Sequence, residues 1–317
     1  MASKSVRQAE VRADVVLRTE GLVKDYGAVR ALDGVDLEVH RGEVFGFVGP
    51  NGAGKTTAIR ILLDLLRPTA GKAEVLGLAP AEGGSELRRR IGYLPGELRL
   101  SEQATARELL GYYAGLRNGS GAERIKPLAR RFGLKELDRP IRTLSEGNKQ
   151  KIGIVQAFIH EPELLILDEP SGGLDPLLQR ELLDLVLEAQ GAGATVFMSS
   201  HVLSEVEAVA GRVAVIRQGR IVDTEDVRTL RHRAGQNVEI RFAEPVAVEE
   251  FRGIPGVKDA AVKDLTLTCL LFGEPDALLK AAARHHVVAW SAQLRTLEEL
   301  FLDYYRVPNE QEAADAR

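Results

Sequence analysis

Residues 49–56 have the sequence Gly49-Pro50-Asn51-Gly52-Ala53-Gly54-Lys55-Thr56, and this stretch decides the fold. It matches the pattern G-x-x-x-x-G-K-[ST]. It stands between an apolar run at residues 44–48, which predicts a strand, and residues 57–66, which predict a helix ended by Pro68. Glycines let backbone N–H groups converge on phosphate oxygens, and a helix start adds a partial positive charge. The stretch therefore predicts a phosphate-binding loop in an α/β domain.

Two side chains of this loop carry the expected chemistry. Lys55 is expected to reach the β- and γ-phosphates of ATP, and the hydroxyl of Thr56 is expected to ligate Mg²⁺. Thr57 follows directly and completes the candidate nucleotide contacts.

An apolar run at residues 164–167 ends in two acidic residues, Asp168 and Glu169. A strand that ends in this way places Asp168 at the C-terminal edge of a parallel sheet, beside the phosphate loop, where it can orient Mg²⁺. Glu169 can polarise the attacking water as a general base. Strands often end in Asp, so the motif gains its meaning from the phosphate loop earlier in the chain.

A third motif occupies residues 144–148 and precedes a helical stretch at residues 149–159. Ser145 and Gly147 offer a hydroxyl and backbone N–H groups to an anion at the helix start. In isolation the pattern is typical of an ordinary helix cap. Its position after the phosphate loop and before the acidic strand end indicates a functional role.

This ordered set of motifs resembles that of the nucleotide-binding subunits of ABC transporters, over about residues 15–225. The resemblance implies a P-loop NTPase cassette with a RecA-like α/β core, an antiparallel β subdomain and a helical subdomain at about residues 98–160. It also implies that residues 144–148 are the signature sequence, whose Ser145 and Gly147 contact the γ-phosphate of ATP held by a second copy of the chain.

Three further residues have roles that only this resemblance implies. Asp175 matches the loop that communicates across the dimer. His201, which follows two serines, matches the switch histidine that contacts the γ-phosphate and steadies the catalytic water. Tyr26 matches the aromatic residue that stacks on adenine. Without the resemblance, His201 would be interpreted as a structural residue and Tyr26 as a surface tyrosine in a turn.

The sequence departs from the family pattern in two places. Gly96 stands where the family usually has a glutamine that touches Mg²⁺ and the membrane subunit, so either Glu97 substitutes as a metal contact or that contact is lost. In the signature sequence, Glu146 and Asn148 replace the commoner Gly and Gln. These departures concern coupling to the membrane subunit and leave nucleotide binding intact.

Beyond residue 230 the chain predicts the element order β-α-β-β-α-β, the split βαβ arrangement of a small α+β domain of ferredoxin-like type. This region resembles the accessory domain of exporter ATPases of the daunorubicin-resistance type. A last helix is predicted at residues 296–305, with an apolar face typical of a core or a dimer interface. That face consists of Leu297, Leu300, Phe301 and Tyr304.

The predicted organisation has four parts, which are a flexible N-terminus at residues 1–13, an ATPase domain at 14–229, the accessory domain at 230–307 and a flexible tail at 308–317. The composition is that of an ordinary soluble protein, with 44% hydrophobic and 28% charged residues. A net charge of −4 gives no reason to expect nucleic acid as a partner.

Neither a membrane span nor a secretory signal is visible in the sequence. No run approaches the ~20 apolar residues of a spanning helix, and the charged N-terminus has no apolar centre. The single cysteine, Cys269, lies in an apolar run that predicts a buried thiol in a reducing cytoplasm. We expect a cytoplasmic protein at the inner face of the cell membrane, with a separate permease subunit as its partner.

The predicted function is ATP hydrolysis by two copies of the chain, paired head to tail around two ATP molecules. The pair would drive the permease and export a drug, antibiotic or lipid-like compound; direction rests on the resemblance alone. One alternative is a soluble ABC ATPase of DNA repair or translation, but those usually carry two cassettes or a coiled-coil insertion. Another is a regulator with a dead site, and the joint presence of Lys55, Asp168, Glu169 and His201 argues against it.

Overall fold

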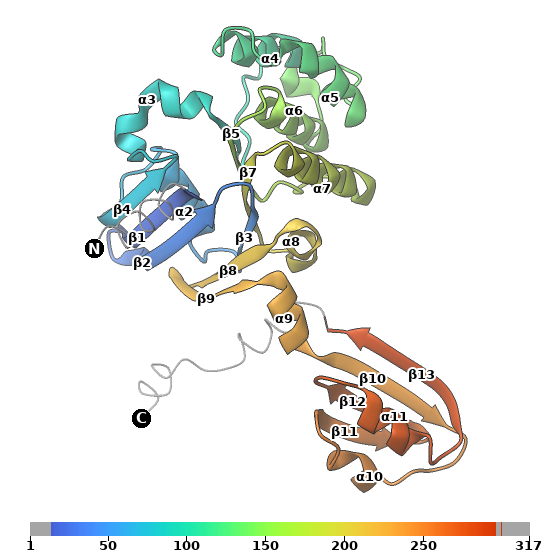
Figure 1. Ribbon diagram of the computed structural model, residues 1–317. Helices are drawn as coiled ribbons and strands as arrows, with labels where there is room; N and C mark the ends of the chain where they lie inside the picture. Colours follow the sequence, from blue (N-terminus) through green and yellow to red (C-terminus); the bar gives the residue numbers. More distant parts are fainter. Residues whose placement is uncertain (1–13, 296–298, 300–317) are drawn as a thin grey trace. The chain divides into compact units, whose positions relative to one another are not determined.

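The computed structural model describes residues 14–295 and Glu299. The chain divides into two compact units between Glu225 and Asp226, and each unit has its own buried core (Figure 1). Some sequence-based predictions concern residues outside the described ones. They are the N-terminus at 1–13, the helix at 296–305 with Leu297, Leu300, Phe301 and Tyr304, and the tail at 308–317.

A six-stranded sheet forms the centre of the first unit, in the order β5-β6-β7-β3-β8-β9 (Figure 1). Its strands run parallel from β5 to β8. Strands β3, β6 and β7 are wholly buried, which explains their largely apolar sequences. The bounds are β3 (Val44–Val48), β5 (Ile91–Leu94), β6 (Leu164–Asp168), β7 (Thr195–Ser200), β8 (Arg212–Arg217) and β9 (Arg220–Asp226).

The last two strands of this sheet are joined by the two-residue turn Gln218-Gly219, a sequence typical of a tight hairpin. Gln218 and Gly219 have φ values of 49° and 76°, as a type I′ turn requires. The turn also holds the phosphate loop, because the N–H of Gly219 donates to the carbonyl of Ala53 at 3.0 Å. Its own carbonyl accepts from the N–H of Asp33 at 2.8 Å, which ties the turn to a second sheet.

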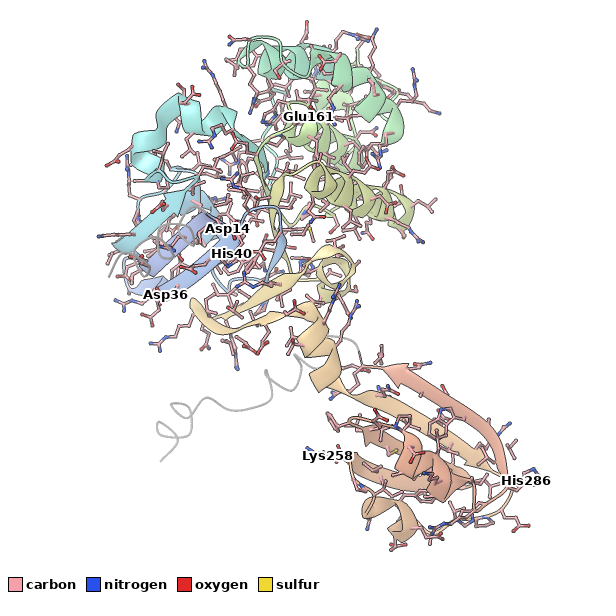
Figure 2. All side chains as sticks on the ribbon, viewed as in Figure 1. Asp14, Asp36, His40, Glu161, Lys258 and His286 are labelled. Carbon is pink, nitrogen blue, oxygen red and sulfur yellow. The ribbon has the colours of Figure 1, made fainter. Side chains whose placement is uncertain are left out.

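This second sheet of the first unit is antiparallel, with the order β2-β1-β4. The β-rich runs at residues 15–17 and 35–39 predict two short strands in this part of the sequence, and the observed strands are longer. They continue past Gly21 and Gly34 through shifts of register, where Asp36 Oδ1 accepts from the N–H of Gly21 at 2.6 Å (Figure 2). The bounds are β1 (Val15–Tyr26), β2 (Val29–His40) and β4 (Ala70–Val75).

Helix α2 (Lys55–Leu62) begins in the phosphate loop and packs into one core with both sheets. The prediction that this helix reaches residue 66 is wrong. Asp64 adopts a left-handed φ of 58°, and the carbonyl of Arg60 accepts hydrogen bonds from the N–H groups of Leu65 and Leu66, at 2.8 and 3.1 Å. These bonds close the helix before Pro68.

The predicted helical segment lies between β5 and β6. Helix α4 starts with a capping box in which Thr105 and Glu108 bond reciprocally, and α6 starts after the cap Ser145. The bounds of the helices of the first unit are α3 (Pro80–Arg89), α4 (Ala106–Gly115), η1 (Ala122–Arg124), α5 (Ile125–Arg131), η2 (Ile141–Thr143), α6 (Glu146–Phe158), α7 (Pro176–Gly191) and α8 (Leu203–Val209).

The second unit contains an antiparallel sheet in the order β11-β12-β10-β13, with the predicted element order β-α-β-β-α-β. Its core includes Cys269 and the rings of Phe242 and Phe251, which lie 5.8 Å apart. Helix α9 precedes this arrangement and was not predicted. The bounds are α9 (Val227–Ala234), β10 (Gln236–Phe242), α10 (Glu249–Arg252), β11 (Val257–Lys263), β12 (Thr266–Leu271), α11 (Asp276–Ala282) and β13 (Val287–Leu294).

Candidate nucleotide-binding site

The phosphate loop leaves the end of β3 and turns into α2. Two of its glycines cannot be replaced without a collision. A Cβ on Gly54, whose φ is 110°, would lie 2.6 Å from the carbonyl oxygen of Ala31, and a Cβ on Gly49 would lie 2.2 Å from that of Ile216. The loop is therefore held against β2 and β8, with the unpaired N–H groups of the first turn of α2 at its end.

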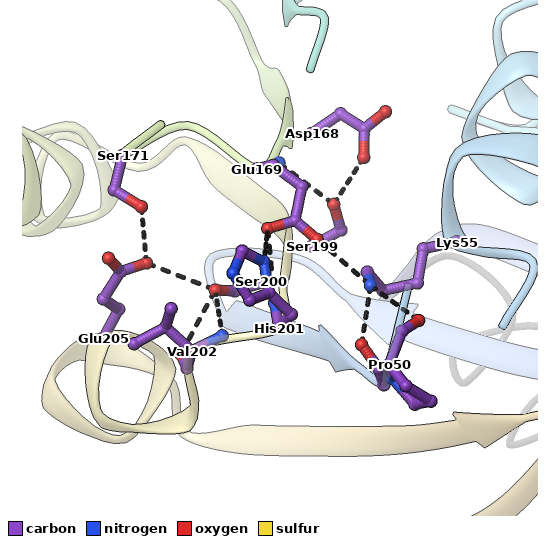
Figure 3. Close-up of polar contacts among 11 residues, drawn as sticks. Pro50, Lys55, Asp168, Glu169, Ser171, Ser199, Ser200, His201, Val202 and Glu205 are labelled. Atoms are coloured by element: carbon purple, nitrogen blue, oxygen red, sulfur yellow. Dashed lines mark hydrogen bonds and ion pairs between the residues drawn. The ribbon is translucent and has the colours of Figure 1, made fainter. Parts of the chain in front are cut away.

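Lys55 is the buried cation of this loop, with only 5% of the residue exposed. Its Nζ donates to the carbonyl oxygens of Gly49 at 2.6 Å and Pro50 at 3.2 Å, and forms an ion pair with Glu169 Oε1 at 3.0 Å (Figure 3). A buried ammonium requires such oxygen partners, because an isolated charge away from water is costly. The same position and charge suit the phosphates of ATP.

Asp168 is fully buried at the end of β6. Its Oδ1 accepts from the hydroxyl of Ser199 at 2.6 Å, while Oδ2 is buried and accepts no hydrogen bond from the residues that the structure describes. A Cβ on Gly96 would lie 3.5 Å from this Oδ2. Burial and the negative charge of Asp168 raise the pKa of nearby Tyr93 to about 12. An unsatisfied carboxylate oxygen of this kind is suited to a cation or to a water held by one.

Glu169 follows Asp168 with a left-handed φ of 49°, which turns the chain sharply out of β6. Burial acts to raise the pKa of Glu169, but hydrogen bonds from Lys55 and His201 outweigh it, and the pKa of Glu169 lies below its usual value. The carboxylate is therefore charged at neutral pH, as a general base must be.

His201 is the second partner of Glu169. Its Nδ1 lies 2.5 Å from Glu169 Oε2, and its backbone N–H donates to the same oxygen at 3.3 Å. Glu169 thus contacts both Lys55 and His201, with Asp168 adjacent to it, although these residues come from three segments far apart in the sequence (Figure 3).

Four other predicted site residues form no hydrogen bond or ion pair with Lys55, Asp168, Glu169 or His201 in the described chain, namely Ser145, Asp175, Tyr26 and Glu97. Ser145 accepts from the N–H of Asn148 at 3.3 Å as the cap of α6. Asp175 caps α7 by accepting from the N–H groups of residues 177 and 178. Tyr26 is 47% exposed at the end of β1, and Glu97 is exposed.

Sequence reasoning missed a set of polar residues around the loop at residues 170–175. Gln150 is buried in α6 and donates to the carbonyl of Pro170 at 2.8 Å. Glu205 in α8 accepts from the hydroxyls of Ser171 and Ser200. Ser199 holds Asp168. The only feature of the sequence that could have indicated a functional role for Gln150 is its place two residues after the signature sequence. No local pattern in the sequence indicates a role for Glu205.

Comparisons with known proteins identify the family. Residues 32–172 match the ABC transporter family. The daunorubicin resistance ATP-binding protein of Streptomyces coeruleorubidus is 35% identical over 293 residues, which cover 90% of this chain and 89% of that protein. This chain is an ABC transporter ATP-binding subunit. The linearmycin resistance ATP-binding protein of Bacillus subtilis is 32% identical and is covered to 97%.

A solved structure agrees with this assignment. The ATP-binding subunit of an ABC transporter is 34% identical, with a TM-score of 0.65, and the match covers 69% of this chain and 92% of that one. As an ABC ATPase the chain binds and hydrolyses ATP, and its first unit is the ATPase cassette predicted from the motifs. No helix within the described residues is long and apolar enough to cross a bilayer.

Proposed function

We propose that two copies of this ABC ATPase close around two ATP molecules and drive a separate membrane protein. One observation carries the dimer. Glu169 pairs with both Lys55 and His201, whereas Ser145 caps the start of α6 and forms no hydrogen bond with any of these three residues in the described chain. A helix N-terminus with a hydroxyl beside it suits a phosphate. Ser145 and Gly147 would therefore complete the site of the second copy, in a two-fold head-to-tail pair.

Each remaining residue takes one task in this site. Lys55 and the loop residues 49–57 hold the phosphates, and Tyr26 stacks on adenine at the exposed end of β1. Glu169 takes a proton from the attacking water, and His201 contacts the γ-phosphate from the other side of Glu169. Asp175, in the loop after Glu169, faces the partner copy.

Mg²⁺ is the proposed metal. The described residues contain no cluster of three His, Cys, Asp or Glu side chains, so we assign the other ligands to the phosphates of ATP and to water. Asp168, with its buried and unsatisfied Oδ2, and the hydroxyl of Thr56 fit the remaining positions. The bound ion would neutralise charge on the phosphates. Glu97 is the proposed third contact from the protein, since Gly96 has no side chain to offer.

The proposed cargo is a drug, an antibiotic or a lipid-like compound, and the proposed direction is export. Three relatives support it by name, the daunorubicin resistance and linearmycin resistance proteins and the bacitracin transport ATP-binding protein of Bacillus licheniformis, 36% identical. The proposed location is the inner face of the cell membrane, beside a separate permease and without nucleic acid. Co-purification of a multi-helix membrane protein with the tagged chain tests this part.

Glu169→Gln tests the dimer mechanism, because it keeps the size of the side chain and removes its basicity. We expect turnover to fall by about 10²–10⁴-fold while ATP holds the chain as a dimer, measured by phosphate release and by gel filtration with light scattering. Glu163→Gln is the matched control, since Glu163 pairs with Arg90 and not with the site. A variant that binds ATP and stays monomeric would overturn the paired mechanism.

Glu97→Ala tests the proposed metal contact of Glu97. If Glu97 replaces the family glutamine, the Mg²⁺ concentration for half-maximal ATPase activity should rise several-fold. Glu123→Ala, a change of another exposed glutamate in the first unit, is the control. An unchanged Mg²⁺ dependence would remove Glu97 from the site.

A further inference from the structure

Helix α8 carries a buried carboxylate that the catalytic roles above do not use. Glu205 is only 9% exposed. Its Oε2 accepts from the hydroxyl of Ser171 at 2.7 Å and from that of Ser200 at 3.2 Å (Figure 3). It forms no ion pair with any residue in the described part of the chain. A buried carboxylate without a cation is costly, so its presence calls for a reason beyond packing.

The two hydroxyls belong to the two loops that carry the catalytic groups. Ser171 lies two residues after Glu169, and Ser200 lies immediately before His201. Ser200 is itself fixed, because its Oγ accepts from the N–H of Val202 at 2.9 Å. Its one hydroxyl hydrogen is shared between Glu205 and the carbonyl of Val202, which lies 3.1 Å from Oγ. One carboxylate oxygen thus links the loop after the general base to the loop of the histidine.

Helix α8, which carries Glu205, is held in place by tight packing against the central sheet. Val206, next to Glu205 in the chain, is fully buried and packs against Gly46 in the centre of β3 so tightly that a Cβ on Gly46 would lie 2.1 Å from Val206 Cγ1. Strand β3 runs directly into the phosphate loop. The position of Glu205 is therefore set by the same strand that sets the position of Lys55.

We propose that Glu205 is a positioning residue for ATP hydrolysis, which holds Glu169 and His201 in their mutual contact by fixing the loops at residues 170–175 and 199–202. In this role it acts through Ser171 and Ser200. ATP binding depends on the phosphate loop, so loss of the link lowers kcat and leaves the affinity for ATP unchanged.

The test compares variants of the full chain in steady-state ATPase assays and equilibrium ATP binding. Glu205→Ala should lower kcat about tenfold or more, with KM and the Kd of ATP within about twofold of wild type. Glu205→Gln should lie between the two, because its neutral amide oxygen can still accept from the hydroxyls but forms weaker hydrogen bonds than a carboxylate. Ser204→Ala, at an exposed position of the same helix, is the matched control and should equal wild type.

A second pair of substitutions separates positioning from mere support of the fold. Ser171→Ala with Ser200→Ala leaves the carboxylate on α8 but removes both links, and should lower kcat as much as Glu205→Ala does. Adding Glu205→Ala to this double variant should then cause little further loss, since all three changes break one unit.

Several outcomes would overturn the proposal. Wild-type kcat in the double serine variant would do so, including in the case where Glu205→Ala fails to fold. A fall in ATP affinity that matches the fall in kcat would show a general loss of structure, which thermal melting would confirm. The comparison does not depend on the dimer, because a failure of the paired mechanism alters the wild-type oligomeric state and not the ratio of kcat between variants.

Discussion

Gly46 in β3 and Val206 in α8 form a contact that two substitutions can break and restore. Gly46→Ala places a methyl group 2.1 Å from Val206 Cγ1 and 2.9 Å from Val213 Cγ1, so we expect the free energy of unfolding to fall by about 1–3 kcal/mol from overpacking. Val206→Ala removes two buried methyl groups, at about 0.8 kcal/mol each plus a cavity term, which gives about 2 kcal/mol.

The double variant should be less destabilised than the sum of the two. Val206→Ala removes Cγ1 and leaves Cβ, which would lie 3.5 Å from the new methyl group, an ordinary contact distance. The clash with Val213 remains, so only part of the strain is relieved. We therefore expect a favourable coupling of about 1–2 kcal/mol between the two sites.

Urea unfolding of the full chain measures these differences with an internal reference. The single tryptophan, Trp290, packs against the core of the second unit, so its fluorescence reports that unit, while circular dichroism reports both. We expect the transition seen by Trp290 to stay unchanged in all three variants. Gly111→Ala in α4 is the control, because a Cβ there meets no atom within 4 Å; it should stabilise by about 0.5–1 kcal/mol.

Additive effects, within about 0.5 kcal/mol, would refute the idea that the methyl group introduced at Gly46 competes with the side chain of Val206 for one space. So would a Gly46→Ala variant as stable as wild type, because β3 would then have room to move. Either result would also remove the firm base that the positioning role of Glu205 requires.

Three further predictions each rest on a single contact or a single buried group. Gly54→Ala should abolish ATP binding in equilibrium dialysis, since its φ of 110° and the 2.6 Å approach to Ala31 both exclude a side chain. The Arg90 hydrogen bonds hold the pKa of Glu163 below its usual 4.5 despite partial burial, so this carboxylate stabilises the fold above that pH. The carboxylate should stabilise the fold by under about 1 kcal/mol at this exposed site, and this contribution should vanish as the pH falls through the lowered pKa. Unfolding curves of wild type and Glu163→Gln should therefore converge at low pH. Burial raises the pKa of the Cys269 thiol, so a thiol reagent should label it slowly until urea unfolds the second unit; fast native labelling would contradict its burial.

The sequence predicted best where one local pattern determined the structure. Strands β3 and β6 match the predicted apolar runs within one residue, because burial on both faces requires continuous apolar sequence. The end of α2 was missed because the apolar pattern continues to residue 66, while the left-handed Asp64 interrupts the backbone. Strands β1 and β2 were predicted too short because half-exposed strands tolerate glycines and charges inside them.

In the candidate site too, residues that stand in a local motif could be predicted, and residues defined by distant contacts could not. Lys55, Asp168, Glu169 and His201 stand in motifs, and their contact follows from the parallel order of β3, β6 and β7. Glu205 stands in no motif that the sequence alone reveals, because its partner Ser171 is 34 residues away. Its role could not be predicted until α8 was placed against β3.

The loop at residues 170–175 is held from two sides, by helix α8 and by helix α6. Glu205 binds Ser171 from α8, and Gln150 binds the carbonyl of Pro170 from α6, the helix that starts at the signature sequence. Gly147 lies at the start of α6 so close to this loop that a Cβ there would be 3.0 Å from the carbonyl of Gly173. A shift of α6 toward this loop would therefore press on the residues that follow Glu169. If the start of α6 meets the nucleotide of a second copy, the same contact that closes the pair also sets the general base of its own chain, so that neither site hydrolyses ATP before the other is engaged.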